Sequence, residues 1–134
     1  MKEQEKENLF RTFSAVIESI IREKRETQKY RDLLEEFEAR INLDLQVEED
    51  YYFHLNLVFH DGEVSLNRGE LDEYDLKLLS SPEAMMFFAN GENSILHMLF
   101  KKNRFGERKL RIKKGTTGRN IGKLLKVSKI LVLD

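Results

Sequence analysis

The spacing of the apolar residues changes near residue 41, and this change most constrains what the chain can fold into. Before it, apolar residues recur at helical spacing from Leu9 to Ile21 and again from Tyr30 to Ile41. At about 100° per residue the two apolar stripes are rotated by roughly 120°, so one straight helix could not bury both. We therefore expect two helices, near residues 5–23 and 27–41.

After residue 41 apolar and polar residues alternate, which is typical of strands with one buried face. The alternation covers residues 43–47 and 53–59, with Val58 as the exception, and continues beyond the tight-turn sequence Asp61-Gly62. A further strand is expected around Tyr74–Leu78. The pattern predicts an antiparallel sheet with one face covered and one face in water.

The second half of the chain returns to helices, with one more strand among them. Ser81-Pro82-Glu83 is a strong helix start, and Asn90-Gly91 is a helix stop. A short apolar segment follows at 95–100, then an alternating strand at 109–113, a turn at 115–118 and a final helix. We expect one α+β domain over residues 1–134, with N-terminal helices at 1–41 and, at 42–134, a five-stranded, mainly antiparallel sheet, covering helices and a C-terminal amphipathic helix.

Composition excludes several classes of protein. The chain has no cysteine, which excludes disulfide frameworks, thiol nucleophiles and cysteine-rich metal sites. No apolar run approaches the ~20 residues of a membrane span, and the N-terminal segment MKEQEKEN is rich in charged residues, unlike a signal peptide. We expect a cytoplasmic location.

Charge is distributed unevenly along the chain. Residues 101–134 hold 12 of the 23 Lys and Arg residues but only two acidic residues, Glu107 and Asp134. Such a basic segment fits an anionic partner: nucleic acid, phospholipid head groups or an acidic protein. The same charge distribution is equally well explained if the basic segment 101–134 folds against the acidic helix at the start of the chain.

Three segments approach catalytic or metal-binding motifs, and each lacks what its motif requires. Gly118–Lys123 has three residues between its glycines instead of the four of a phosphate-binding loop, and Leu124 replaces the required Ser or Thr. His54 and His60 are six residues apart on one strand face, too far to share a metal without a third ligand. His97 is expected at the core or a pocket edge. We expect no catalytic residue, no cofactor and no metal ion.

Large, soft apolar side chains are concentrated between residues 85 and 100. Met85–Phe88 forms a consecutive run, and Met98–Phe100 repeats the feature. Methionine adapts its shape and suits surfaces that accept variable apolar guests. The same run also fits a helix buried on two sides, between the sheet and another helix, and both interpretations remain open.

Short motifs between residues 43 and 131 follow one another in a recognisable order. They are Asp61-Gly62 with the strand 63–67, Gly69, Asp75-Leu76, the Met/Phe helix from Ser80-Ser81 to Gly91, the strand Lys109–Ile112 with Gly115, and Asn120–Lys126. In this order they resemble the sterol carrier protein type lipid-transfer domain family. The nearest match is Asn120-Ile121-Gly122, at the start of the final amphipathic helix.

The resemblance implies a sheet covered by helices, with an apolar tunnel between the layers that binds sterols, fatty acids or acyl esters without catalytic residues. The implied function is non-enzymatic binding and carriage of such a hydrophobic ligand. The implied tunnel lining comes from the inner face of the sheet and from the later helices: Phe53, Leu55, Leu57, Met85, Met86, Phe88, Ile95, Met98, Leu99, Ile121, Leu124 and Leu125.

The chain departs from the family pattern at two insertions, Lys101–Arg108 and Thr116–Arg119, and the resemblance puts both near the tunnel mouth. Positive charge there implies contact with a lipid head group or peripheral contact with an anionic membrane, through Lys101, Lys102, Arg104, Arg108, Arg119, Lys123 and Lys126. The alternative is an interaction module with a filled core, which binds an acidic partner or nucleic acid through this basic third. We do not expect nucleic acid, because Phe100 and Phe105 are the region's only aromatic residues.

Overall fold

Two helices open the chain, as the two apolar stripes predicted. In the computed structural model, which describes residues 1–114 and 119–132, α1 spans Glu3–Lys24 and α2 spans Gln28–Glu36. Phe13, Ile20 and Ile21 of α1 are buried. No helix in these described ranges is long and apolar enough to cross a membrane.

The second helix is shorter than the sequence predicted. It ends at Glu36 instead of residue 41, and the first strand already begins at Ala39. The reason lies in the pattern itself, because Phe37, Ala39 and Ile41 are all buried and alternate with exposed or polar residues. The alternation therefore starts near Phe37, and Ile41 belongs to the sheet.

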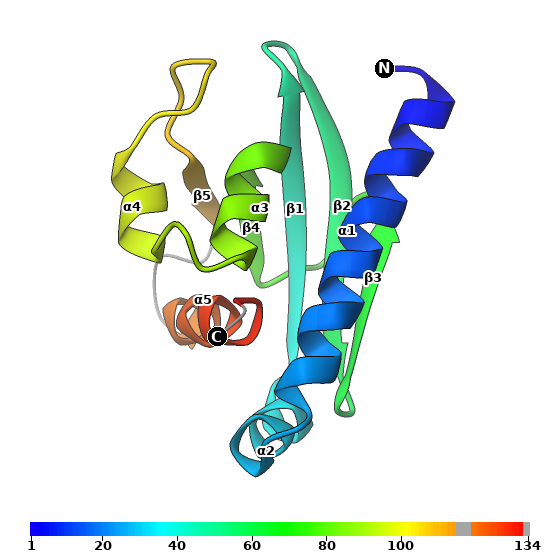
Figure 1. The fold of residues 1–134 in the computed structure, drawn as a ribbon, viewed down its shortest axis with the longest axis vertical. Helices are drawn as coiled ribbons and strands as arrows, with labels where there is room; N and C mark the ends of the chain where they lie inside the picture. Colours follow the sequence, from blue (N-terminus) through cyan, green and yellow to red (C-terminus); the bar gives the residue numbers. More distant parts are fainter. Residues whose placement is uncertain (115–118, 133–134) are drawn as a thin grey trace.

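The five expected strands form one sheet (Figure 1). They are β1 (Ala39–Glu48), β2 (Tyr51–His60), β3 (Glu63–Arg68), β4 (Leu76–Ser80) and β5 (Leu110–Lys114). Their order is β3-β2-β1-β4-β5, and every pairing is antiparallel except β1 with β4, which is parallel. The predicted α+β class and mainly antiparallel sheet are confirmed.

The turn between β2 and β3 is the one that the sequence predicted. Asp61 and Gly62 both have positive φ angles, 51° and 79°. Two consecutive residues in this region make a type I′ turn, whose twist matches that of the strands it joins. This turn sets the register in which Phe59 lies opposite Val64.

The outer face of the sheet is less exposed than the alternation predicted. The segment between β3 and β4 crosses it and buries Asn42 and Asn56. Asn42 Nδ2 donates to the Leu71 carbonyl at 3.0 Å, and the Leu71 N–H donates back to Asn42 Oδ1 at 2.8 Å. Asn56 Nδ2 donates to the Gly69 carbonyl at 3.0 Å. These side-chain amides form hydrogen bonds with the backbone of the crossing segment. Both asparagines can therefore be buried, because their polar atoms have partners.

Three later helices lie on the inner face: α3 (Pro82–Ala89), α4 (Ile95–Phe100) and α5 (Arg119–Ile130). The predicted cap of α3 is confirmed, since Ser81 Oγ accepts from the Ala84 N–H at 3.2 Å. Gly91, with φ of 79°, follows the end of the same helix. The expected turn at 115–118 lies outside the described residues.

The helices divide the inner face between them (Figure 1). α1 lies along β2 and β3, whereas α3, α4 and α5 lie over β1, β4 and β5. The strands present alternate residues to these helices, so that one continuous apolar surface is buried: Ala39, Ile41, Leu43, Leu45, Phe53, Leu55, Leu57, Phe59, Leu76 and Leu78.

Candidate ligand cavity

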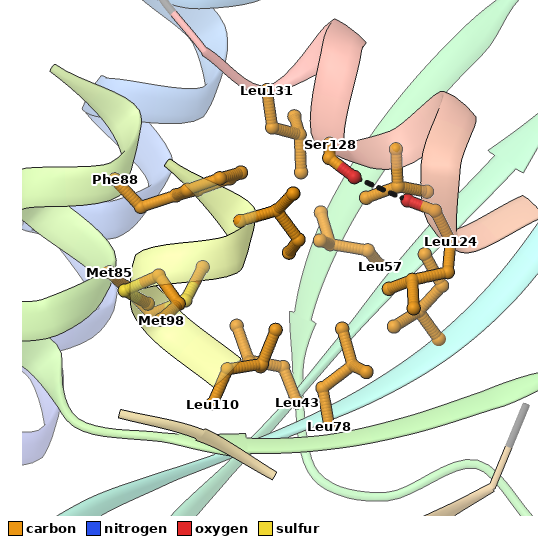
Figure 2. A pocket seen from close by; sticks show the side chains of 13 residues that line it. Leu43, Leu57, Leu78, Met85, Phe88, Met98, Leu110, Leu124, Ser128 and Leu131 are labelled. Carbon is orange, nitrogen blue, oxygen red and sulfur yellow. Dashed lines mark hydrogen bonds between the residues drawn. The ribbon is translucent and has the colours of Figure 1, made fainter. Parts of the chain in front are cut away.

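An apolar cavity of about 40 Å³ lies between the sheet and the three later helices (Figure 2). Among the described residues, its lining contains one polar side chain, Ser128, whose hydroxyl donates to the Leu124 carbonyl at 2.7 Å. The lining residues are Ile41, Leu43, Leu57, Leu78, Met85, Phe88, Ile95, Met98, Leu110, Leu124, Val127, Ser128 and Leu131.

Regular spacing in each element brings these side chains together. Met85 and Phe88 are three residues apart on α3, and Ile95 and Met98 are three apart on α4. Residues at this spacing share one face of a helix, here the face turned toward the cavity. Figure 2 shows Met85 and Met98 side by side, and Phe88 on the same side of the cavity as Leu131 and Ser128 of the C-terminal segment.

The cavity is small in this structure. A volume of about 40 Å³ holds only a few water-sized spheres, and a site walled by apolar atoms stays dry. Typical pockets for small organic ligands are roughly 300–1,000 Å³. An acyl chain therefore fits only if the lining side chains repack or the covering helices move outward.

Six of the residues that the sequence placed in the tunnel line this cavity: Leu57, Met85, Phe88, Ile95, Met98 and Leu124. Phe53 and Leu55 are buried on the same sheet face but do not line it, and Met86 and Leu99 are half-buried against the core. Leu125 is 54% exposed. The side chain of Ile121 lies outside the described part of the structure.

Sequence reasoning missed seven lining residues: Ile41, Leu43, Leu78, Leu110, Val127, Ser128 and Leu131. The alternation of apolar and polar residues predicted that the strand residues Leu43, Leu78 and Leu110 face the interior. Their place in the cavity depends on which strands the three helices cover, and that is a property of the tertiary fold.

The basic residues form two separate groups. Figure 1 shows the loop that contains Lys101–Arg108 at one end of β5 and α5 near the other. Lys101, Lys102, Arg104 and Arg108 are exposed, and none of them lines the cavity. On α5, Lys126 is exposed, whereas Lys123 Nζ lies 3.0 Å from Asp75 Oδ2. The side chain of Arg119 is not among the described ones.

The ion pairs of the basic third do not involve the acidic residues of the first helix. Within the described residues, Arg104 pairs with Glu83 at 3.6 Å, Arg111 with Glu107 at 3.7 Å, and Lys123 with Asp75. Arg104 Nη2 also donates to the Val47 carbonyl at 2.8 Å. Among the described residues, the carboxylates paired with this basic third thus come from α3 and from the segments at 75 and 107.

A charged cluster lies on the outer face of the sheet, away from the cavity. His54 Nδ1 is 2.7 Å from Asp44 Oδ1 and 3.1 Å from Glu70 Oε1, and Lys77 Nζ lies within 3.7 Å of both carboxylates. Burial disfavours the charged ammonium, but attraction to Asp44 and Glu70 outweighs it and raises the pKa of Lys77. Lys77 thus balances the charge of Asp44, whose side chain is only 5% exposed.

The other two histidines are separate from this cluster. His60 Nδ1 is 2.7 Å from Glu38 Oε2, and its Nε2 is 3.1 Å from Asp61 Oδ2. The hydrogen bond to Glu38 and the charge of Asp61 raise the pKa of His60. His97 Nε2 lies 2.9 Å from Lys109 Nζ, and desolvation together with this ammonium lowers the pKa of His97.

Comparison with known proteins identifies the fold. No protein-family model and no curated protein matches the sequence. The crystal structure of sterol carrier protein 2 is similar with a TM-score of 0.58 and 17% sequence identity, over 87% of this chain and 91% of that one. A solution structure from Thermus thermophilus, described as possibly a sterol carrier protein, has a TM-score of 0.53 and 18% identity over 87% and 79% of the two chains. The resemblance noted in the sequence is therefore confirmed at the level of the fold: this chain has the fold of the sterol carrier proteins.

Proposed function

We propose that this protein binds and carries a hydrophobic ligand, such as a sterol, a fatty acid or an acyl ester, in the space between the sheet and α3–α5. The observation that carries the proposal is the apolar cavity, which lies between the sheet and helices of a sterol carrier fold. The driving force is the transfer of apolar groups out of water, about 0.8 kcal/mol for each buried methylene.

Loading of the cavity requires its walls to separate, and the lining is suited to this. Met85 and Met98 lie side by side in its wall (Figure 2), and unbranched thioether side chains change rotamer more readily than branched ones. The covering helices α3 and α4 are short, with eight and six residues. Such short elements shift without disturbing the sheet beneath them.

The chemistry of the lining favours binding over reaction. Among the described residues that line the cavity there is no carboxylate, histidine, lysine or cysteine, and the only hydroxyl, Ser128, is hydrogen-bonded to the helix backbone. General acid, general base and nucleophilic catalysis each need such a group within reach of the substrate. The proposal is therefore a carrier without enzymatic activity. It includes the cytoplasmic location that is expected from the sequence.

The proposal includes peripheral contact with an anionic membrane, from which a carrier takes its ligand. Lys101, Lys102 and Arg108 are exposed next to Leu96 and Phe100, which are 64% and 68% exposed and lie four residues apart on α4. Each basic residue near an anionic surface contributes about 1 kcal/mol, and exposed apolar side chains insert between head groups.

The second candidate is the interaction module with a filled core. The small volume of the cavity, about 40 Å³, favours this second function, because a protein that binds its partner through its surface requires no larger cavity. In that account the exposed basic residues and Phe100 bind an acidic partner protein.

Two measurements separate these functions. Mass spectrometry of organic extracts from gently purified protein is expected to find one lipid per chain, and a fluorescent fatty acid is expected to bind and be displaced by unlabelled lipid. An empty extract together with no binding of the fluorescent fatty acid contradicts the carrier function and favours the filled core.

A further inference from the structure

A shallow groove of about 410 Å³ adjoins the cavity on its outer side. Phe88, Ile95 and Ser128 line both the cavity and the groove, so these three side chains form the wall between them. Figure 2 shows Phe88 of α3 and Ser128 of α5 on the same side of the cavity. The groove is thus the direction in which the cavity would open to solvent.

Two polar side chains in the groove have unused donors. The Nδ2 atom of Asn93 is buried and has no hydrogen-bond acceptor in the described structure. Lys129 also lines the groove, and no carboxylate of the described residues lies within ion-pair distance of it. Of the hydroxyl groups in the lining, Ser94 Oγ caps α4 by accepting from the His97 N–H, and the Ser128 hydroxyl donates to the Leu124 carbonyl. A buried donor without a partner is unusual in a folded protein.

The rest of the groove is mainly apolar. Tyr30, Leu125 and Val132 also line it, together with the shared residues Phe88 and Ile95. The lining of the groove therefore includes an amide donor and an ammonium, and its shared wall leads to the apolar cavity. An asparagine amide and a lysine ammonium both donate hydrogen bonds, so together they fit an acceptor that carries negative charge.

We propose that Asn93 and Lys129 form the head-group site for a single-chain lipid that ends in an anionic oxygen group, a carboxylate or a phosphate. The inference rests on the proposed carrier function and names the ligand class that the same site takes. The lipid chain passes between Phe88, Ile95 and Ser128 into the cavity, while the head group stays in the groove. A sterol, whose hydroxyl is uncharged, gains much less from Lys129.

This placement differs from the one that the resemblance implied. The sequence placed head-group contacts at Lys101–Arg108 and at Arg119, Lys123 and Lys126. Of these, the residues with described side chains line neither the cavity nor the groove. Lys126 lies on the same helix as Lys129, is exposed, and is absent from the groove, so it serves as a matched control.

The test compares three ligands with the same ten-carbon chain: decanoate, decyl phosphate and 1-decanol. Binding is measured by isothermal titration calorimetry with the whole chain and with the variants Lys129→Gln, Asn93→Ala and Lys126→Gln. At least one anionic ligand is expected to bind more tightly than 1-decanol, and the tighter of the two identifies the head group. Lys129→Gln is expected to weaken that ligand by about tenfold, as the loss of one charged hydrogen bond does, and to leave 1-decanol unchanged.

The controls separate a specific site from general charge. Lys126→Gln is expected to leave all three affinities unchanged. Asn93→Ala is expected to weaken the anionic ligand without lowering the melting temperature of the free protein, because the Nδ2 donor that it removes has no partner there. A lower melting temperature with unchanged affinity means that Asn93 has a structural role only, and overturns its place in the head-group site.

The remaining outcomes distinguish this inference from the carrier function. Equal binding of 1-decanol and both anions, unchanged in Lys129→Gln, overturns the head-group site and leaves carriage intact. An equal loss in Lys126→Gln and Lys129→Gln also overturns it, since a general positive field then explains the preference. Failure of all three ligands to bind the unmodified protein contradicts the carrier function itself, and the head-group site with it.

Discussion

Met85 of α3 and Met98 of α4 line one apolar cavity from two neighbouring helices, whereas Met86, the next residue after Met85, does not line it. The sequence placed all three methionines in the same tunnel. The structure thus separates Met86 from the other two methionines, and Met86 serves as a matched control for testing what the cavity does.

Met98→Trp is expected to fill the cavity and abolish binding of a fluorescent fatty acid while the protein still folds. Met98 is only 1% exposed, so the larger ring has nowhere to go except into the ligand space. Met86→Trp, at a half-buried position outside the cavity, is expected to leave binding within about twofold of the unmodified protein. Fluorescence titration measures both affinities.

The same pair of variants tests the filled-core account. In a filled core, Met98→Trp overpacks the interior and costs about 1–3 kcal/mol of the free energy of unfolding. Urea denaturation measures this cost. A clear loss of stability with unchanged fatty-acid binding would show that Met98 is part of an ordinary core.

Lys101→Gln combined with Lys102→Gln is expected to weaken binding to vesicles that contain anionic lipid, and added salt is expected to have the same effect. Both residues are exposed, so the melting temperature is expected to stay the same. Arg104 is left in place because its guanidinium bonds to the Val47 carbonyl. Vesicle co-sedimentation measures the binding.

The control for this change removes two exposed charges elsewhere, Arg22 of α1 and Lys29 of α2, with the substitutions Arg22→Gln and Lys29→Gln. It alters net charge by the same amount on a different part of the molecule. Equal loss of vesicle binding in the control and in the Lys101/Lys102 variant would rule out a specific membrane-facing surface.

Asn42→Ala is expected to lower the free energy of unfolding by about 2 kcal/mol, because both backbone groups of Leu71 lose their partner. Asn8→Ala, at an exposed position on α1, is expected to change it by less than about 0.5 kcal/mol. Urea denaturation provides both values. A neutral Asn42→Ala would mean that the segment crossing the outer face is held by other contacts.

His60 and His97 are expected to shift stability with pH in opposite directions. Because Glu38 and Asp61 raise the pKa of His60, its contribution is fully present below the ordinary histidine value of 6.5 and is lost as the pH rises through the higher folded value. Because burial and Lys109 lower the pKa of His97, that residue is destabilising when the pH falls below 6.5.

Melting temperatures of the unmodified protein, His60→Gln and His97→Gln between pH 5.5 and 8, roughly the range in which histidine titrates, test both signs. The stability advantage of the unmodified protein over His60→Gln is expected to shrink as the pH rises. Its advantage over His97→Gln is expected to grow over the same range. Slopes of the same sign for the two differences would contradict these assignments.

Local signals in the sequence predicted much of the fold. The Asp61-Gly62 turn and the Ser81 cap depend on a few neighbouring residues, and the structure contains both. The parallel pairing of β1 with β4 depends on a segment that crosses the outer face, which no short-range pattern encodes. The predicted end of the second helix was also wrong, because the positions of Phe37 and Ile41 are consistent with both helical and alternating spacing.

The site was harder to predict than the fold, because it depends on which elements pack against each other and not on local patterns. Alternation shows that Leu78 and Leu110 face inward, but it does not show that α3–α5, and not α1, cover them. Asn93 offered no sequence signal, because an unpartnered donor is visible only when its surroundings are known. Lys129 and Lys126 are the same type of residue on the same helix, and only their positions around the axis of α5 place Lys129 in the groove and Lys126 outside it.

The central claim is that an apolar ligand binds between the sheet and α3–α5, and the four methionines allow it to be tested residue by residue. Isotope labelling of the methionine methyl groups gives one NMR signal for each of Met1, Met85, Met86 and Met98. Titration with decanoate is expected to shift the Met85 and Met98 signals most, to shift Met86 less, and to leave Met1 unchanged. Unchanged Met85 and Met98 signals at millimolar decanoate would contradict the claim.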